Sequence, residues 1–145
     1  MPATASSQEG KLLATPVVTQ FEGAGGGGLV PFATLAGYAS DEDIAVNGFA
    51  TRLNVDEFDL TVKGMSFNYH DRVELSLATQ KLGVDPLALD IRQQVAGIKV
   101  RLYGDIVYSA MPQVSVGLQH KKLKDKTVAR AVGADKLQDT DIYLA

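Results

Sequence analysis

The sequence contains no cysteine and no tryptophan. The absence of cysteine excludes disulfide bonds, a thiolate nucleophile and metal sites that depend on cysteine ligands. No stretch approaches the roughly 20 consecutive apolar residues of a membrane-spanning helix, so a helical membrane protein is excluded. That test does not bear on a β-barrel, whose strands cross a membrane with alternating residues. Nothing else in the composition indicates a bound cofactor, and we expect none.

An excess of positive charge is also missing. The 14 lysines and arginines are outnumbered by 17 aspartates and glutamates, and the net charge is -3. We therefore expect no nucleic-acid partner. The length of 145 residues suits one domain, and we assign residues 1–10 to a flexible N-terminal segment and residues 11–145 to a single domain. The first residues lack the basic and apolar regions of a signal peptide.

Helical periodicity is almost absent, and apolar residues instead recur at every second position. This is the period of a β-strand with one apolar and one polar face. Short polar connections between the strands predict antiparallel neighbours. Within 58–69 the apolar set changes phase, which predicts a bulge at Gly64. The expected strands are 14–22, 29–38, 44–55, 58–69, 72–81, 91–103, 112–119, 128–134 and a last one that begins in "DTDIYLA".

These strands predict an all-β fold, an antiparallel up-and-down meander that forms a β-barrel or partial β-barrel of about eight or nine strands. Bacterial outer-membrane barrels usually have an even number of strands. Since the ninth strand is cut short, we expect either that 14–22 is not a strand or, preferably, that the chain is the front part of a longer protein.

The stretch "FEGAGGGGLVPF" at 21–32 places Gly23, Gly25 and Gly28 on the GxGxxG spacing of dinucleotide sites. Such a site needs a helix after the glycines, because the helix N-terminus binds the pyrophosphate. Here Pro31 and an alternating pattern follow. We therefore expect no nucleotide, and we interpret the tract as a hinge between the first two strands.

The other candidates for a catalytic or metal site are also better explained as structural features. His70 and His120 lie in or beside expected turns, and we interpret both as surface residues. No G-x-S-x-G motif is present. The basic tract, which comprises Lys121, Lys122, Lys124 and Lys126, is interpreted as a solvated hairpin tip in preference to a site for phosphates of nucleic acid or lipopolysaccharide. We assign no catalytic, metal-binding or cofactor-binding residues and expect that the protein is not an enzyme.

Charged residues within strands are the remaining candidates. Antiparallel pairing of 72–81 with 91–103 brings Glu74 near Lys99 or Arg101 on one face. Alternation fits a soluble barrel with an apolar interior and a membrane barrel with a polar lumen equally well. In the second case, the residues expected to line the lumen are Arg72, Glu74, Lys99 and Arg101.

The runs "FATRLNVDEFDLTVKGMSFNYHDRVELSLATQKL" and "IRQQVAGIKVRLYGDIVY", together with the segments around them, resemble an uncharacterised proteobacterial family of outer-membrane β-barrel proteins. The family carries a domain-of-unknown-function label, and this chain resembles its N-terminal half. The resemblance implies an exported barrel and brings no catalytic residues. It implies location in the bacterial outer membrane, although no signal peptide is present in this sequence.

The expected function is therefore that of a non-enzymatic outer-membrane barrel, either a passive porin-like channel or a structural envelope component, with membrane lipid as its partner. Two alternatives stay open. The first is a soluble barrel that binds an apolar small ligand. The second is an interaction subunit whose open sheet edges pair with further copies or with another protein.

Overall fold

The computed structural model describes residues 20–27, 30–36, 44–84, 89–104, 111–124 and 136–145. These residues form β-strands, turns and bends and contain no helix. Accordingly, no helix of this described part is long and apolar enough to cross a membrane.

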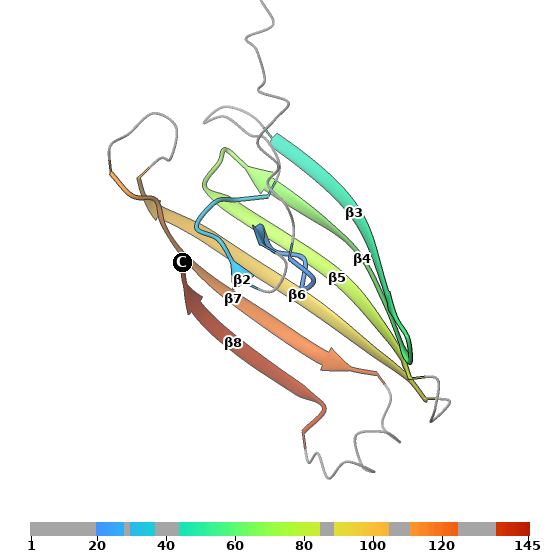
Figure 1. The fold of residues 1–145 in the computed structure, drawn as a ribbon. Helices are drawn as coiled ribbons and strands as arrows, with labels where there is room; N and C mark the ends of the chain where they lie inside the picture. The colour runs from blue at the N-terminus through green and yellow to red at the C-terminus, as the bar shows by residue number, and fades with distance from the viewer. Residues whose placement is uncertain (1–19, 28–29, 37–43, 85–88, 105–110, 125–135) are drawn as a thin grey trace, which may run out of the picture.

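A six-stranded antiparallel sheet makes up most of the molecule, and Figure 1 shows it as a strongly curved surface. Its order β3-β4-β5-β6-β7-β8 follows the chain, so each strand pairs with its predecessor. In the described residues the sheet does not close, and β3 and β8 form its two edges. The strands are β3 (Ile44–Val55), β4 (Phe58–Tyr69), β5 (Val73–Val84), β6 (Leu89–Tyr103), β7 (Val114–Leu123) and β8 (Gln138–Leu144).

Tight turns join β3, β4 and β5, the first three strands of the six-stranded sheet. Asp56 and Glu57 form a two-residue connection between the paired residues Val55 and Phe58. At the next connection, His70 and Asp71 have φ values of 51° and 48°. Positive φ at both central positions characterises the turn whose twist matches a hairpin, and histidine and aspartate tolerate it better than most residues.

Burial alternates along the strands and gives the sheet two unlike faces. On the inner face, which carries Glu74, Ser76, Lys99 and Ser115, the side chains are mostly small or polar and buried. On the outer face, the large apolar side chains are exposed, including Leu75 at 47 % and Ile98 at 42 %. The usual arrangement of a water-soluble sheet, with apolar side chains buried, is thus inverted.

A short N-terminal segment covers the inner face. This inner segment, residues 20–27 and 30–36, contains the two-stranded hairpin of β1 (Gly26–Gly27) and β2 (Val30–Pro31). In Figure 1 it lies across the middle of the sheet, over β5 and β6. A small apolar core forms between the segment and the sheet, and its members are Ala24, Leu35, Ala36, Val62, Ala78 and Val95.

The structure confirms the all-β antiparallel meander and corrects several details. β3 and β4 have the predicted bounds. β5 and β7 begin and end later than predicted, and β6 begins earlier. The predicted strand 29–38 is wrong in its described part, 30–36, because only Val30–Pro31 is extended there and residues 33, 34 and 36 are bends. Most of the predicted strand 14–22 and all of 128–134 lie outside the described residues, and 20–22 are not in a strand.

The predicted bulge at Gly64 is also wrong. β4 pairs without interruption with both neighbours. The change of phase has another cause: in the first half of β4 the apolar residues, such as Val62, lie on the inner face, and in the second half Met65 and Phe67 lie on the outer face. The strand continues without a bulge while its apolar residues change from one face to the other.

Candidate functional site

Glu74 and Lys99 form a buried ion pair at the centre of the inner face. Glu74 on β5 pairs with Lys99 on β6 in the sheet register, and the ammonium nitrogen lies 3.3 Å from Oε2 of the carboxylate. Each residue is 1 % exposed. A charge removed from water in this way is costly unless it is paired and hydrogen-bonded on its remaining sides. The predicted proximity of Glu74 to Lys99 is confirmed.

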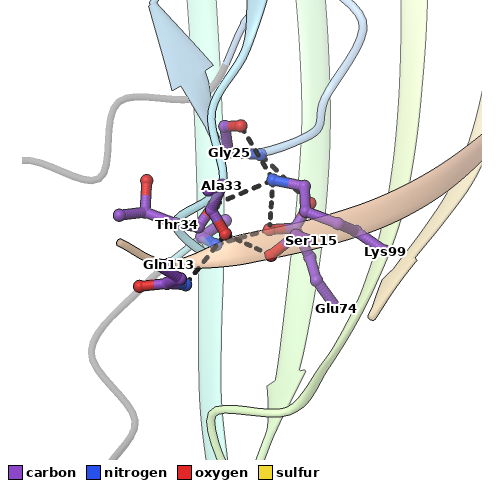
Figure 2. Close-up of polar contacts among 8 residues, drawn as sticks. Gly25, Ala33, Thr34, Glu74, Lys99, Gln113 and Ser115 are labelled. Atoms are coloured by element: carbon purple, nitrogen blue, oxygen red, sulfur yellow. Dashed lines mark hydrogen bonds and ion pairs between the residues drawn. The ribbon is translucent and has the colours of Figure 1, made fainter. Parts of the chain in front are cut away.

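The remaining hydrogen bonds of the pair go to the backbone of the inner segment, as Figure 2 shows. Glu74 accepts a hydrogen bond from the amide of Gly25 at 3.0 Å and another from the amide of Ala36 at 2.5 Å. Lys99 donates to the carbonyl oxygens of Gly25 and Thr34, both at 2.8 Å. The carboxylate thus binds donors and the ammonium binds acceptors, and both fix the same loop of chain.

Neutral side chains on the same face add to this attachment. Ser115 and Gln113 both donate to the carbonyl oxygen of Ala33, at 2.5 and 2.8 Å (Figure 2). Further along β5, Gln80 donates to the carbonyl oxygen of Phe21 at 2.7 Å. Because these contacts come from β5, from β7 and from the residue just before β7, the inner segment is fastened to strands on either side of β6.

A second ion-pair group holds the beginning of the inner segment. The ammonium group of Lys121 on β7 lies 2.5 Å from Oε1 of Glu22 and 2.9 Å from Oδ2 of Asp141. Lys121 therefore connects the segment to both β7 and β8. The prediction that the basic tract forms a hairpin tip is wrong for Lys121 and Lys122, since both lie within β7 and point to opposite faces. Lys124 follows the end of β7. Lys126 lies outside the described residues.

The glycine tract allows the inner segment to approach the sheet closely. A Cβ atom on Gly25 would lie 3.0 Å from Oε2 of Glu74 and 2.9 Å from both the amide nitrogen of Ala36 and the carbonyl oxygen of Thr34. Gly23 has a φ of 97°, and a Cβ there would meet Ala78 at 3.1 Å. The interpretation as a hinge between two strands is therefore corrected: Gly23 to Gly26 are buried contact residues.

The other two residues predicted for the lumen lie at one end of this site. Arg101 follows Lys99 on the inner face of β6 and donates to the carboxylate of Asp71 at 2.6 Å. Arg72 lies in the turn before β5 and is exposed, and its amide donates to the carbonyl oxygen of Tyr69. The structure therefore brings Glu74 and Lys99 together on the covered inner face, with Arg101 on the same face beside them. Arg72 lies next to Arg101 at the rim, where its carbonyl oxygen accepts a hydrogen bond from the amide of Arg101 at 2.9 Å.

Several buried polar atoms on the inner side have no hydrogen-bond partner among the described residues. Both side-chain polar atoms of Asn68 and of Gln20, the hydroxyl of Ser66 and Nε2 of Gln119 are in this group. A buried polar group without a partner costs about 1–3 kcal/mol. The interior between the inner segment and the sheet therefore contains buried polar groups beside its small apolar core.

The outer face carries a continuous apolar surface. Successive pairings place side chains of all six strands in rows across the sheet, and the middle row is apolar throughout. Its members are Val46, Phe67, Leu75, Ile98, Leu118 and Ile142, which are between 36 and 76 % exposed. The row on one side adds Ile44, Tyr69 and Leu144. The row on the other side adds Met65 and Leu77 and ends, on β7 and β8, in the polar residues His120 and Thr140. No charged residue lies in these three rows.

The histidines and acidic residues of the described part of the chain do not gather into a metal site. This part contains no group of three or more histidine, cysteine, aspartate or glutamate side chains that could hold a metal ion. His70 lies in a turn and stacks on Tyr69, with ring centroids 4.0 Å apart. His120 lies within β7 and not in a turn, with Nδ1 2.9 Å from the hydroxyl of Thr140. The site can hold a segment of backbone, and its charged groups are occupied in doing so.

Comparison with known proteins gives one match. A family model described as "Protein of unknown function (DUF3034)" matches residues 15–145. No curated protein and no solved structure matches the chain. The resemblance noted from the sequence is thereby confirmed at the level of a domain of unknown function, and the description names no activity, ligand or location.

Proposed function

This chain belongs to the family described as Protein of unknown function (DUF3034), and we propose that it forms wall strands of a β-barrel in a bacterial outer membrane and has no enzymatic activity. The observation that carries this proposal is the inverted sheet. Large apolar side chains are exposed on the outer face, while Glu74 and Lys99 are buried on the inner face. Barrels in membranes alternate in this sense, with apolar residues toward lipid and polar residues toward the lumen.

The dimensions of the sheet support the same function. β3 to β7 are between 10 and 15 residues long, and a tilted strand needs about 9–11 residues to cross a bilayer. An exposed apolar surface that extends over six strands is unusual for a protein in water and marks a surface that is covered in use. A lipid bilayer can cover this surface without a complementary shape, whereas a protein partner would need one.

The polar interior fits an aqueous lumen. Buried polar atoms of Asn68, Gln20, Ser66 and Gln119 have no partner within the part of the chain that the structure describes, and water satisfies such atoms where there is room for it. The inner segment fills the middle of this lumen in the manner of a plug. We therefore propose a passive role, as a channel that the plug keeps closed or as a structural envelope component. In the channel, Glu74, Lys99 and Arg101 line the wall and Arg72 lies at its rim.

A soluble barrel with a buried apolar ligand requires the apolar face to point inward. Leu75 and Ile98 are exposed, so we do not propose that alternative. The unpaired edges of β3 and β8 favour a second candidate, in which these edges pair with further strands. Such pairing would complete the wall, and it is compatible with the membrane function.

Insertion into vesicles tests the proposed function. Urea-unfolded protein is diluted into phosphatidylcholine vesicles, which are floated on a density gradient and treated with protease. We expect the protein to float with the vesicles and the segment 73–103 to be protected. Recovery of a monodisperse, folded protein in the bottom, lipid-free fraction would contradict the proposal.

A further inference from the structure

A band of basic side chains borders the apolar rows of the outer face at the end that carries the β3–β4 turn. The next row after Met65 and Leu77 contains Lys63 and Lys122, and the row beyond contains Lys81 and Arg92. All are exposed. The complete set, which we name the basic belt, consists of Arg52, Lys63, Lys81, Arg92, Lys122 and Lys124.

The basic belt carries more positive charge than its neighbours compensate. Arg52 is paired with Asp59 at 2.6 Å and Lys81 with Asp90 at 3.0 Å. Within the described part of the chain, no ion pair involves Lys63 or Lys122. This concentration of positive charge stands out in a chain whose net charge is -3.

Lys81 and Arg92 lie directly opposite each other on β5 and β6, so the belt runs without a gap from one strand to the next at this level. The long aliphatic stems of lysine and arginine also lie along apolar surface while their charged ends reach a more polar layer.

The order of the rows matches a membrane boundary. Along the outer face, the apolar rows are followed by the basic belt and then by the acidic turn that contains Asp56 and Glu57. Lipid phosphates lie between the hydrocarbon core and water, and they attract basic residues at that depth. We propose that the basic belt binds the phosphate groups of anionic lipids and thereby fixes the depth of the sheet in the bilayer. This inference rests on the proposed membrane function.

Neighbouring lysines on β7 provide a matched test. Lys122 lies on the outer face in the belt, whereas Lys121 lies on the inner face with Glu22 and Asp141. The experiment measures partition of the full chain into phosphatidylcholine vesicles with and without 30 mol % phosphatidylglycerol, and the readout is the ratio of the two affinities. This ratio is insensitive to a general loss of protein stability, because such a loss weakens binding to both kinds of vesicle equally.

We expect the unmodified protein to prefer the anionic vesicles. Since a basic residue near an anionic surface contributes roughly a fivefold gain in affinity, the variant Lys63→Gln/Lys122→Gln should lose about 25-fold of that preference. The control Lys121→Gln should retain it. An unchanged preference in the double variant, an equal loss in the control, or the same lysine dependence of binding to duplex DNA would overturn the inference. Failure to enter either kind of vesicle would instead count against the membrane function itself.

Discussion

Removal of the charge at position 74 should release the inner segment from the sheet. In Glu74→Gln, one carboxylate oxygen becomes an amide nitrogen, which cannot accept a hydrogen bond from Gly25 or Ala36. The substitution also leaves the ammonium group of Lys99 without its counter-charge, and Lys99 is 1 % exposed. Removing one partner of a buried ion pair typically costs about 3–5 kcal/mol.

This cost should appear as undocking of the inner segment and not as unfolding of the sheet. When the segment leaves, water reaches Lys99 and hydrates its charge, while the ladder between β5 and β6 keeps its backbone hydrogen bonds. A destabilisation of about 3–5 kcal/mol corresponds to a population of the undocked state that is larger by roughly 10² to 10⁴-fold. The assay is hydrogen exchange in detergent micelles, followed by mass spectrometry of peptides from 20–36 and from β5.

We expect exchange to accelerate in 20–36, which includes the amides of Gly25 and Ala36, and to change little in β5. The control is Glu57→Gln, which removes a carboxylate from an exposed turn. A second variant, Glu74→Lys/Lys99→Glu, retains two opposite charges but turns the carboxylate toward carbonyl oxygens. It should therefore not restore protection. Unchanged exchange of 20–36 in Glu74→Gln, or full protection in the reversed pair, would refute this account of the attachment.

Three further outcomes follow from the packing. Gly64→Ala should destabilise the folded protein by about 1–3 kcal/mol in urea titrations, because the new Cβ would lie 2.5 Å from the carbonyl oxygen of Leu77. Gly48→Ala should be tolerated, because a Cβ at position 48 has no atom within 4 Å. Equal unfolding midpoints for the two variants would show that the contact at Gly64 is unimportant. Leu75→Arg should lower the free energy of unfolding of the lipid-embedded protein by about 2–4 kcal/mol, and Thr79→Arg, in the same row as Lys63 and Lys122, by about 0–1 kcal/mol. Equal losses would argue against a membrane boundary between the two rows. Ser115→Ala should cost about 1 kcal/mol in the same urea titration, since it removes a buried hydrogen bond to Ala33, and a loss above 3 kcal/mol would indicate a role beyond that bond.

Alternation in the sequence was sufficient to predict the large strands, because a strand period of two is a local property. It also predicted the contact between Glu74 and Lys99, since tight connections leave few registers for adjacent strands. The bounds of β3 and β4 came directly from the short turns that separate them. The phase change at Gly64 was misread because a strand that changes its apolar face and a strand with a bulge produce the same pattern.

The role of the glycine tract could not be predicted in this way. Gly25 contacts residues 49 and 74 positions away on the chain, and local periodicity says nothing about such contacts. One signal for such a contact was present in the sequence. A carboxylate and an ammonium group lie on the polar face of adjacent strands, and they need further hydrogen-bond partners if that face is not exposed to water. A glycine-rich segment, whose backbone is accessible from close range, supplies both amides and carbonyl oxygens.

The central claim concerns which face of the sheet contacts lipid, and the absence of cysteine makes it directly measurable. Single cysteines introduced at each position from 73 to 79 can be labelled with an environment-sensitive fluorophore in vesicles and quenched from the lipid or from the water. We expect lipid quenching at 73, 75 and 77, no lipid quenching at 74, 76 and 78, and a return to aqueous quenching at 79. Lipid quenching at the even positions, or no alternation at all, would contradict the account.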